Sequence, residues 1–170
     1  EFLKAAALEI KTLEDNGTWE EVPVSAAQGR IIPGTWTFKR KRTPDGTISR
    51  HKARYCLRGD LMEKTEDTFA PVVAFATVRL FTVLVLTLGW ESTTIDYTNA
   101  FTQAPLRSPC WIRLPLGFGS TASGATCLKL KKTLYGSVIA PKTFFLHLLG
   151  ILQGLRFKQS VYDPCLMFRE

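Results

Sequence analysis

Asp96 is the side chain in this sequence whose position most strongly indicates chemistry. It ends the β-branched run at residues 92–96, and no lysine or arginine occurs between Arg79 and Arg107. A carboxylate at a strand end is costly to bury unless it is paired or binds a cation, and a divalent metal ion would meet that need. On spacing alone an aspartate here is more often a turn or helix cap, so both interpretations stand at this point.

A run of basic residues indicates a second chemistry, the binding of anions. Between Lys39 and Arg58 the chain carries eight lysines and arginines and one acidic residue, Asp45. The whole sequence has 22 basic and 15 acidic residues and a net charge of +7, so 14 of each sign remain outside this run. The excess charge is therefore local, which favours a phosphate-binding surface, although a solvated charged face would also explain a charge run.

Other kinds of site find little support in the sequence. The four cysteines show no CxxC spacing and the two histidines are far apart, so a zinc site is not indicated. Without secretory context we expect reduced thiols rather than disulfides. The longest apolar run, at residues 80–90, is too short to span a bilayer, and no signal peptide is evident. We therefore expect an intracellular protein with no membrane partner.

The elements that must position these groups mix helices and strands without regular βαβ alternation, which indicates an α+β fold. Apolar spacing predicts a helix over about residues 2–15 and a strand near 18–24. Residues 35–42 and 47–57 alternate apolar and polar side chains about a Pro-Asp-Gly turn, which predicts a basic β-hairpin with one apolar face. A helix that follows Thr77, its expected cap, is apolar nearly all round and should be covered on several sides.

Further elements are expected in the second half of the chain. Residues 92–96 predict a short strand that carries Asp96, followed by a short helix at 97–101. Residues 111–114 and 127–130 predict strands, and 117–126 an exposed loop. A helix should begin near Pro141 and continue to about residue 155, and a last strand is expected at 165–168.

Ten short motifs, read in order, resemble the landmarks of the reverse-transcriptase domain of copia-type (Ty1/copia) retrotransposons. They are LEDNGTWEEVP, GTWTFKRK, DGxISRHKAR, DTFAPVV, TVRLF, GWxxxxIDxxxAF, LPLGF, LKKTLYG, APK and SVYDPCLMF. Each motif is weak by itself, but their order and near-usual spacings extend over essentially the whole chain. The resemblance implies the fingers and partial palm of a right-hand polymerase, with mixed helices and mostly antiparallel sheet.

The resemblance also implies roles for individual residues. Asp96 matches the catalytic aspartate that binds two Mg²⁺ ions in this family, and the backbone carbonyl of Tyr97 would bind one of them. Phe101 would lie under the incoming sugar and favour deoxynucleotides, although it could equally be a core residue. Lys52 and Arg54 would approach the triphosphate. The nucleic-acid-binding residues would be Lys39, Arg40, Lys41, Arg42 and Arg58.

Residues 1–170 would form a single partial reverse-transcriptase domain. About residues 18–90, with the basic hairpin at 35–58, would be fingers-like, and about 91–170 palm-like. In the family a YVDD-type hairpin with two further carboxylates follows the SVYDPCLMF motif, so we expect this chain to be truncated before it and to be inactive by itself. Ile139 stands where the family usually has a glutamine that positions template and nucleotide.

The expected function is therefore that of a fragment of an RNA-directed DNA polymerase, a nucleotidyltransferase from a retrotransposon polyprotein. Its partners would be an RNA or DNA template–primer and dNTPs, in a cytoplasmic particle and in the nucleus. Two alternatives remain open. The chain could be a decayed, inactive relic of such an element, or a non-enzymatic basic nucleic-acid-binding module that uses the hairpin alone.

Overall fold

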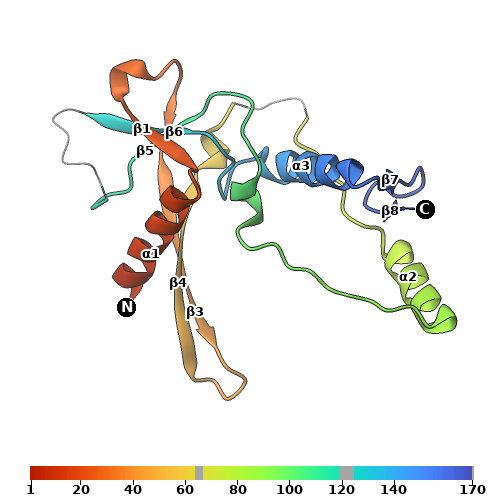
Figure 1. The fold of residues 1–170 in the computed structure, drawn as a ribbon. Coiled ribbons are helices and arrows are strands. Elements are labelled where there is room, and N and C mark those ends of the chain that lie inside the picture. Colours follow the sequence, from red (N-terminus) through yellow and green to blue (C-terminus); the bar gives the residue numbers. More distant parts are fainter. Residues whose placement is uncertain (64–66, 119–124, 170) are drawn as a thin grey trace.

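A four-stranded sheet forms the centre of the computed structural model, which describes residues 1–63, 67–118 and 125–169. Its strand order is β1 (Trp19–Pro23), β6 (Thr126–Leu130), β5 (Trp111–Arg113) and β2 (Ile31–Ile32). The β2–β5 pair is parallel and the other two pairs are antiparallel. Helices combined with mostly antiparallel sheet confirm the predicted α+β class. Figure 1 shows that a long hairpin and helix α2 project from this centre.

Helix α1 (Phe2–Asp15) packs on the junction between the sheet and the hairpin. Ala6, Ile10 and Leu13 recur at helical spacing and are its buried residues, as the apolar periodicity predicted. The chain leaves the helix through Gly17, which has a φ of +60°. Ile10 and Leu13 join a core that also contains Ile32, Tyr55, Leu57, Ile112, Leu128, Leu130 and Leu134.

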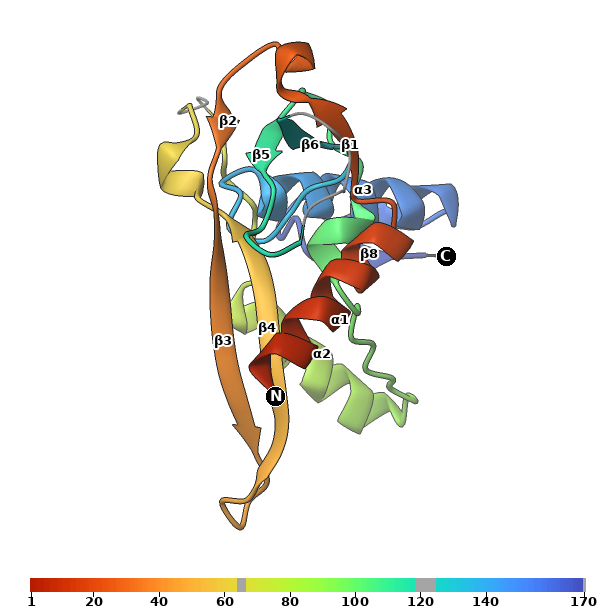
Figure 2. The same cartoon turned by 90° about the vertical axis from the view of Figure 1, so that its left-hand side faces the viewer.

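The predicted hairpin is confirmed as β3 (Gly34–Arg42) and β4 (Ile48–Leu57). Figure 2 shows it as a long ribbon that extends well beyond α1. Ala53, Tyr55 and Leu57 are buried, and the Tyr55 hydroxyl donates to the Arg113 carbonyl oxygen of β5 (2.6 Å). Phe38, which pairs with Ala53, is 49 % exposed, and residues 39–42 and 48–50 farther out are exposed. The apolar face therefore anchors the base of the hairpin and leaves the outer half exposed.

The end of β4 is also fixed to the LKKTLYG motif. The Leu57 amide donates to the Tyr135 carbonyl oxygen (2.7 Å). Gly136 approaches the same strand so closely that an added Cβ would lie 2.2 Å from the Leu57 carbonyl oxygen, and its φ is +81°. Only glycine meets both requirements, because it has no Cβ and adopts positive φ at little cost.

We expect Gly136→Ala to lower the free energy of unfolding by about 2 kcal/mol or more, because left-handed strain is added to backbone overlap. Gly150→Ala is the matched control. Gly150 lies in helix α3 (Ala140–Gly154), where an added Cβ meets nothing within 4 Å, so this change should stabilise the fold by about 0.5–1 kcal/mol. Urea denaturation measures both, and a Gly136→Ala variant as stable as the wild type would contradict the prediction.

Helix α2 (Phe75–Leu88) corrects two predictions. The helix begins at Phe75 after its N-cap residue Ala74, so Thr77 lies inside the first turn and is not the cap. None of its residues is buried, and Leu86 is 77 % exposed. Both views show α2 standing away from the central sheet (Figures 1 and 2). Apolar residues all round a helix indicate that burial of its surface is favourable. They do not ensure that other described residues of the chain pack against that surface.

Asp163, 89 residues after Ala74, holds the start of α2. Its Oδ2 accepts hydrogen bonds from the Ala74 amide (2.9 Å) and the Thr77 hydroxyl (2.5 Å), and its Oδ1 accepts one from the Cys165 amide (2.8 Å). These hydrogen bonds, with that of Thr77 the largest contribution, lower the pKa of Asp163 below its ordinary value. The aspartate of the SVYDPCLMF motif thus joins two distant segments.

The attachment of α2 should therefore depend on pH. Because the folded-state pKa is lowered, the contribution of Asp163 is complete above the unfolded value of about 3.9 and is lost as pH falls through the lowered folded value. Hydrogen exchange at the first turn of α2, corrected for intrinsic rates, should show increased opening below about pH 4. Asp163→Asn should open this turn already at neutral pH and show no pH step. A wild type without that step would argue against the assignment.

The predicted strand at residues 92–96 is wrong. Residues 90–97 have no regular secondary structure and are exposed. A strand requires backbone hydrogen bonds to a neighbour, and no described strand pairs with this segment. The short helix expected at 97–101 is a 3₁₀ helix displaced to Ala100–Gln103.

The remaining elements agree more closely with the sequence predictions. Helix α3 contains Pro141 in its first turn, as expected. The last strand is shorter than the predicted 165–168, because only β8 (Met167–Phe168) pairs with β7 (Lys158–Gln159). Two further 3₁₀ helices occur at Val24–Ala26 and Gly59–Leu61. The loop predicted at 117–126 falls mostly outside the described residues. No helix in the described ranges is long and apolar enough to cross a membrane.

Candidate functional site

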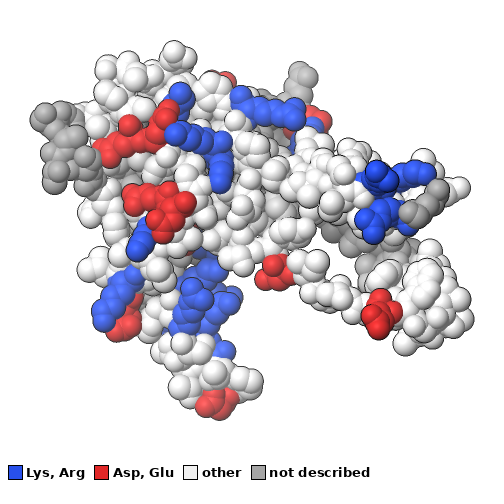
Figure 3. Space-filling view, viewed as in Figure 1, with Lys and Arg blue, Asp and Glu red and all other residues white. Residues whose placement is uncertain are grey.

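The strand register of the hairpin separates its basic residues onto two faces. Directly paired residues share a face and successive residues alternate. The pairs of Arg54 with Thr37, of Lys52 with Lys39 and of Arg50 with Lys41 therefore lie on one face. We call this the basic face, and it comprises Lys39, Lys41, Arg50, Lys52 and Arg54. Figure 3 shows lysine and arginine side chains gathered on the hairpin and an acidic side chain at its tip.

Like charges crowd one another on the basic face. Burial lowers the pKa of Lys52, and repulsion from Arg54, Lys41 and Arg50 lowers it further. Glu9 of α1 lies near Lys52 and Arg54, and burial raises the pKa of its carboxyl. A phosphate bound at this face would relieve the repulsion among the cations, so the face is suited to anion binding.

Two of the predicted nucleic-acid-binding residues lie apart from the basic face. Arg40 pairs with His51 on the opposite face, and its guanidinium carbon lies 5.7 Å from the centroid of the Phe2 ring. Arg42 donates a hydrogen bond to the Gly46 carbonyl oxygen in the hairpin turn (2.6 Å). Both residues remain predictions as nucleic-acid contacts, but their described contacts are structural.

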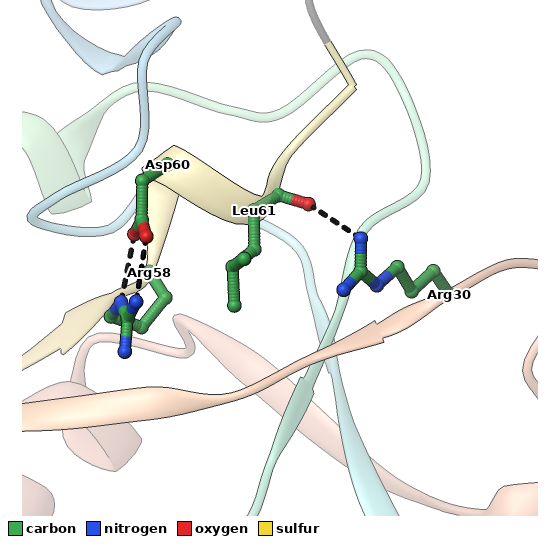
Figure 4. A network of polar contacts seen from close by, with 4 residues as sticks. All are labelled: Arg30, Arg58, Asp60 and Leu61. Carbon is green, nitrogen blue, oxygen red and sulfur yellow. Dashed lines mark hydrogen bonds and ion pairs between the residues drawn. The ribbon is translucent and has the colours of Figure 1, made fainter.

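Arg58 follows β4 and is paired with an acid. Its Nε and Nη2 donate to Oδ1 and Oδ2 of Asp60 at 2.8 and 2.7 Å, as Figure 4 shows. In the same region Nη1 of Arg30 donates to the Leu61 carbonyl oxygen (3.3 Å). These contacts brace the 3₁₀ helix after β4. Because its charge is already matched, we do not include Arg58 in the basic face.

Asp96 is exposed and makes no hydrogen bond or ion pair with another described residue. It is not a helix cap, because the 3₁₀ helix that follows has Asn99 as its N-cap. Because Asp96 is exposed and ends no strand, the cost of burying a carboxylate, from which a bound cation was inferred, does not arise, and its role as a metal ligand stays a prediction. Its carboxylate is free to bind a cation.

A cluster of aromatic rings lies beside the Asp96 segment. The Tyr97 ring is 5.7 Å from that of Phe144, and the Phe101 ring is 6.3 Å from Phe144 and 5.9 Å from Tyr135. All three pairs are edge-to-face, the arrangement that ring quadrupoles favour. We call Tyr97, Phe101, Tyr135 and Phe144 the ring cluster. The guanidinium carbon of Arg54 lies 5.0 Å from the Tyr135 ring centroid, so the structure brings two predicted nucleotide-binding residues, Arg54 and Phe101, to one tyrosine.

The described acidic residues do not form a two-magnesium site. Within residues 1–63, 67–118 and 125–169, no three His, Cys, Asp or Glu side chains gather closely enough to hold a metal ion. The Asp96 carboxylate and the Tyr97 carbonyl are the hard oxygen donors that Mg²⁺ prefers. Two ions that act together need further carboxylates. No catalytic step can therefore be assigned to a metal pair from these residues.

A cavity of about 720 Å³ lies outside this site. Arg30, Leu61, Trp111, Ile139 and Leu146 are among the residues that line it, and none of the predicted site residues does. Ile139 is the N-cap residue of α3. The structure thus places this departure from the family pattern beside the cavity and not in the ring cluster.

Four residues of the site were not predicted to have a role, and Phe144 of α3, which contacts the Tyr97 and Phe101 rings, is one of them. Arg50 belongs to the basic face, and the alternation that also places Lys52 and Arg54 would have identified it. Tyr135 and Asn99 have no such local signal. Their side chains meet through a hydrogen bond that spans 36 residues, and sequence periodicity does not report such contacts.

Comparison with known proteins decides the family. Residues 16–170 match the family described as "Reverse transcriptase (RNA-dependent DNA polymerase)". The chain belongs to the reverse transcriptase family.

Relatives of this reverse transcriptase chain include polyproteins of copia-type plant retrotransposons, which confirms the predicted resemblance. It is 30% identical over 165 residues to the "Retrovirus-related Pol polyprotein from transposon RE1" of Arabidopsis thaliana, covering 95% of this chain and 11% of the relative. It is 27% identical over 172 residues to that from transposon TNT 1-94 of Nicotiana tabacum, covering 99% and 13%. The chain thus spans only about a tenth of the length of these relatives. No solved structure matches it.

Proposed function

We propose that this chain forms the nucleotide- and template-binding part of an RNA-directed DNA polymerase that copies a copia-type element. The observation that carries the proposal is the convergence of Arg54 and Phe101 on the Tyr135 ring. A nucleoside triphosphate has an anionic end and a sugar. The arrangement places a cation and an aromatic ring close enough together for one nucleotide to contact both.

The basic face divides into two proposed parts. Lys52 and Arg54 lie nearer the ring cluster and would bind the triphosphate. Lys41 and Arg50 lie farther along the hairpin, and Lys39 lies opposite Lys52. These three residues would contact the template backbone. Such backbone contacts position a nucleic acid without reading its sequence, as a polymerase that copies any template requires.

Phe101 is proposed to select the sugar. Its ring is held edge-to-face between Tyr135 and Phe144, so it cannot move aside without disturbing two neighbours. A rigid ring under the incoming sugar would clash with a ribose 2′-hydroxyl and leave room for deoxyribose. The proposed partners are accordingly dNTPs and an RNA or DNA template–primer, in a cytoplasmic particle and in the nucleus.

Asp96 is proposed to supply one carboxylate to a magnesium site, with the Tyr97 carbonyl as a second oxygen ligand. The remaining carboxylates would come from elsewhere in the parent polyprotein. Bound Mg²⁺ would neutralise negative charge on the phosphates. The contribution of this chain is to hold one ligand beside the ring cluster.

Primer extension by the intact reverse transcriptase that contains this chain tests the proposal. With an RNA template, a DNA primer and dNTPs, we expect magnesium-dependent synthesis of the complementary strand. A protein that binds the template–primer but does not extend it would refute the proposal and support a non-enzymatic binding module or an inactive relic. Extension that is independent of template sequence composition would agree with backbone contacts.

A further inference from the structure

Tyr135 connects the two groups on which the proposed function rests. Its ring lies 5.0 Å from the Arg54 guanidinium carbon and 5.9 Å from the Phe101 ring. Its hydroxyl donates a hydrogen bond to Oδ1 of Asn99 (O···O 3.0 Å). One side chain thus contacts both the hairpin and the turn that follows Asp96.

The backbone around Tyr135 gives its side chain a defined place. Leu134 is fully buried, with 0 % exposure, and the Tyr135 carbonyl accepts the hydrogen bond from the Leu57 amide. Gly136 also lies against the Leu57 backbone. Burial also raises the pKa of Tyr135, so the phenol stays protonated and able to donate at neutral pH. The Tyr135 backbone cannot shift relative to the hairpin without breaking these contacts.

Asn99 gives the turn after Asp96 its shape. Its backbone is left-handed, with φ 53° and ψ 44°, a conformation that asparagine tolerates better than most residues. Its carbonyl oxygen accepts hydrogen bonds from the amide and the hydroxyl of Thr102, both at 3.0 Å. Hydrogen bonds to Thr102 therefore hold the main chain of the turn, and the hydrogen bond from Tyr135 holds the Asn99 side chain.

Thr133 docks the other end of the same turn. Its hydroxyl donates to the Phe101 carbonyl oxygen, and its amide donates to the Ala104 carbonyl oxygen (3.0 Å). Residues 133–135 thus hold residues 99–104 in place through hydrogen bonds. Of residues 133–135, Tyr135 also contacts Arg54.

We propose that Tyr135 is a positioning residue that sets the place of Arg54 relative to Phe101. This inference rests on the proposed function, in which Arg54 binds the phosphates and Phe101 meets the sugar of one nucleotide. The phosphates and the sugar belong to the same nucleotide, so the distance between Arg54 and Phe101 must match the distance between these two groups. Small displacements from this geometry lower the rate of catalysis strongly. Loss of the Tyr135 hydroxyl should therefore loosen sugar selection before it abolishes synthesis.

The first test is independent of polymerase activity. In this chain, Tyr135→Phe removes the hydroxyl and keeps the ring, so NMR resonances of Asn99 and Phe101 should move while the Arg54 side-chain resonance changes little. Tyr135→Leu removes the ring and should also move Arg54. Tyr162→Phe is the matched control, because Tyr162 is 95 % exposed. Unchanged Asn99 and Phe101 resonances in Tyr135→Phe would overturn the inference.

The second test measures sugar selectivity in the intact reverse transcriptase. Tyr135→Phe should reduce the ratio of kcat/KM for a dNTP to that for the matching rNTP by roughly 3- to 10-fold, as expected for one hydrogen bond. A general loss of folding would lower both terms and leave their ratio unchanged. An active wild type whose selectivity survives in Tyr135→Phe would overturn the positioning role alone. A wild type without primer extension would refute the proposed function, and this inference with it.

Discussion

Asp96→Asn should reduce RNA-templated DNA synthesis by the intact reverse transcriptase by roughly 10²–10³-fold or more in kcat, the scale seen when one preorganised electrostatic group is removed from an active site. The amide keeps the size of the side chain but loses the negative charge that would hold a divalent ion. Asp96 is exposed and bonded to no other described residue, so its loss should not alter the melting temperature. Template–primer affinity and its salt dependence should also stay unchanged.

Glu91→Gln is the matched control for this prediction. Glu91 lies on the same irregular segment as Asp96 and is also exposed, so its amide should leave synthesis intact. Rapid-quench measurement of single-nucleotide addition gives the rate constant of the addition step, and steady-state synthesis gives kcat. Near-normal synthesis by Asp96→Asn, or an equal loss in Glu91→Gln, would remove Asp96 from the proposed site.

Neutralising Lys39, Lys41 and Arg50 of the basic face should weaken nucleic-acid binding and its salt dependence together. In Lys39→Gln/Lys41→Gln/Arg50→Gln, three exposed cations of one face are lost. If each contacts a phosphate, the slope of log K against log salt for a DNA duplex should become shallower by about 2 to 3. We expect an affinity loss on the order of 10- to 100-fold at low salt. Titration of a labelled duplex at several salt concentrations gives both quantities.

A variant with the same change in net charge separates local binding from a general charge effect. Lys4→Gln/Lys11→Gln/Arg79→Gln also removes two lysines and an arginine, all of them exposed and outside the hairpin. Its affinity and salt slope should stay close to those of the wild type. Equal losses in the two triple variants would show that the hairpin has no special role.

Much of the architecture could be predicted because it depends on short-range patterns. The helix over 2–15 and the hairpin about its Pro-Asp-Gly turn follow from residues a few positions apart, and both are confirmed. The strand predicted at 92–96 failed for the opposite reason, because β-branched residues form a strand only where another strand pairs with them. The cap of α2 failed similarly, since the aspartate that holds its start is Asp163, far along the chain.

The candidate site shows the same division. The ordered motifs by themselves determined the family, and they singled out Asp96, Phe101 and the basic hairpin as the residues to examine. Only the tertiary structure decided which cations share a face, that Arg58 is paired with Asp60, and that Arg54 and Phe101 converge on Tyr135. The physical reason is that motif spacing and side-chain alternation are properties of neighbouring residues. The contacts of Tyr135 instead arise from the docking of three segments that are distant in sequence.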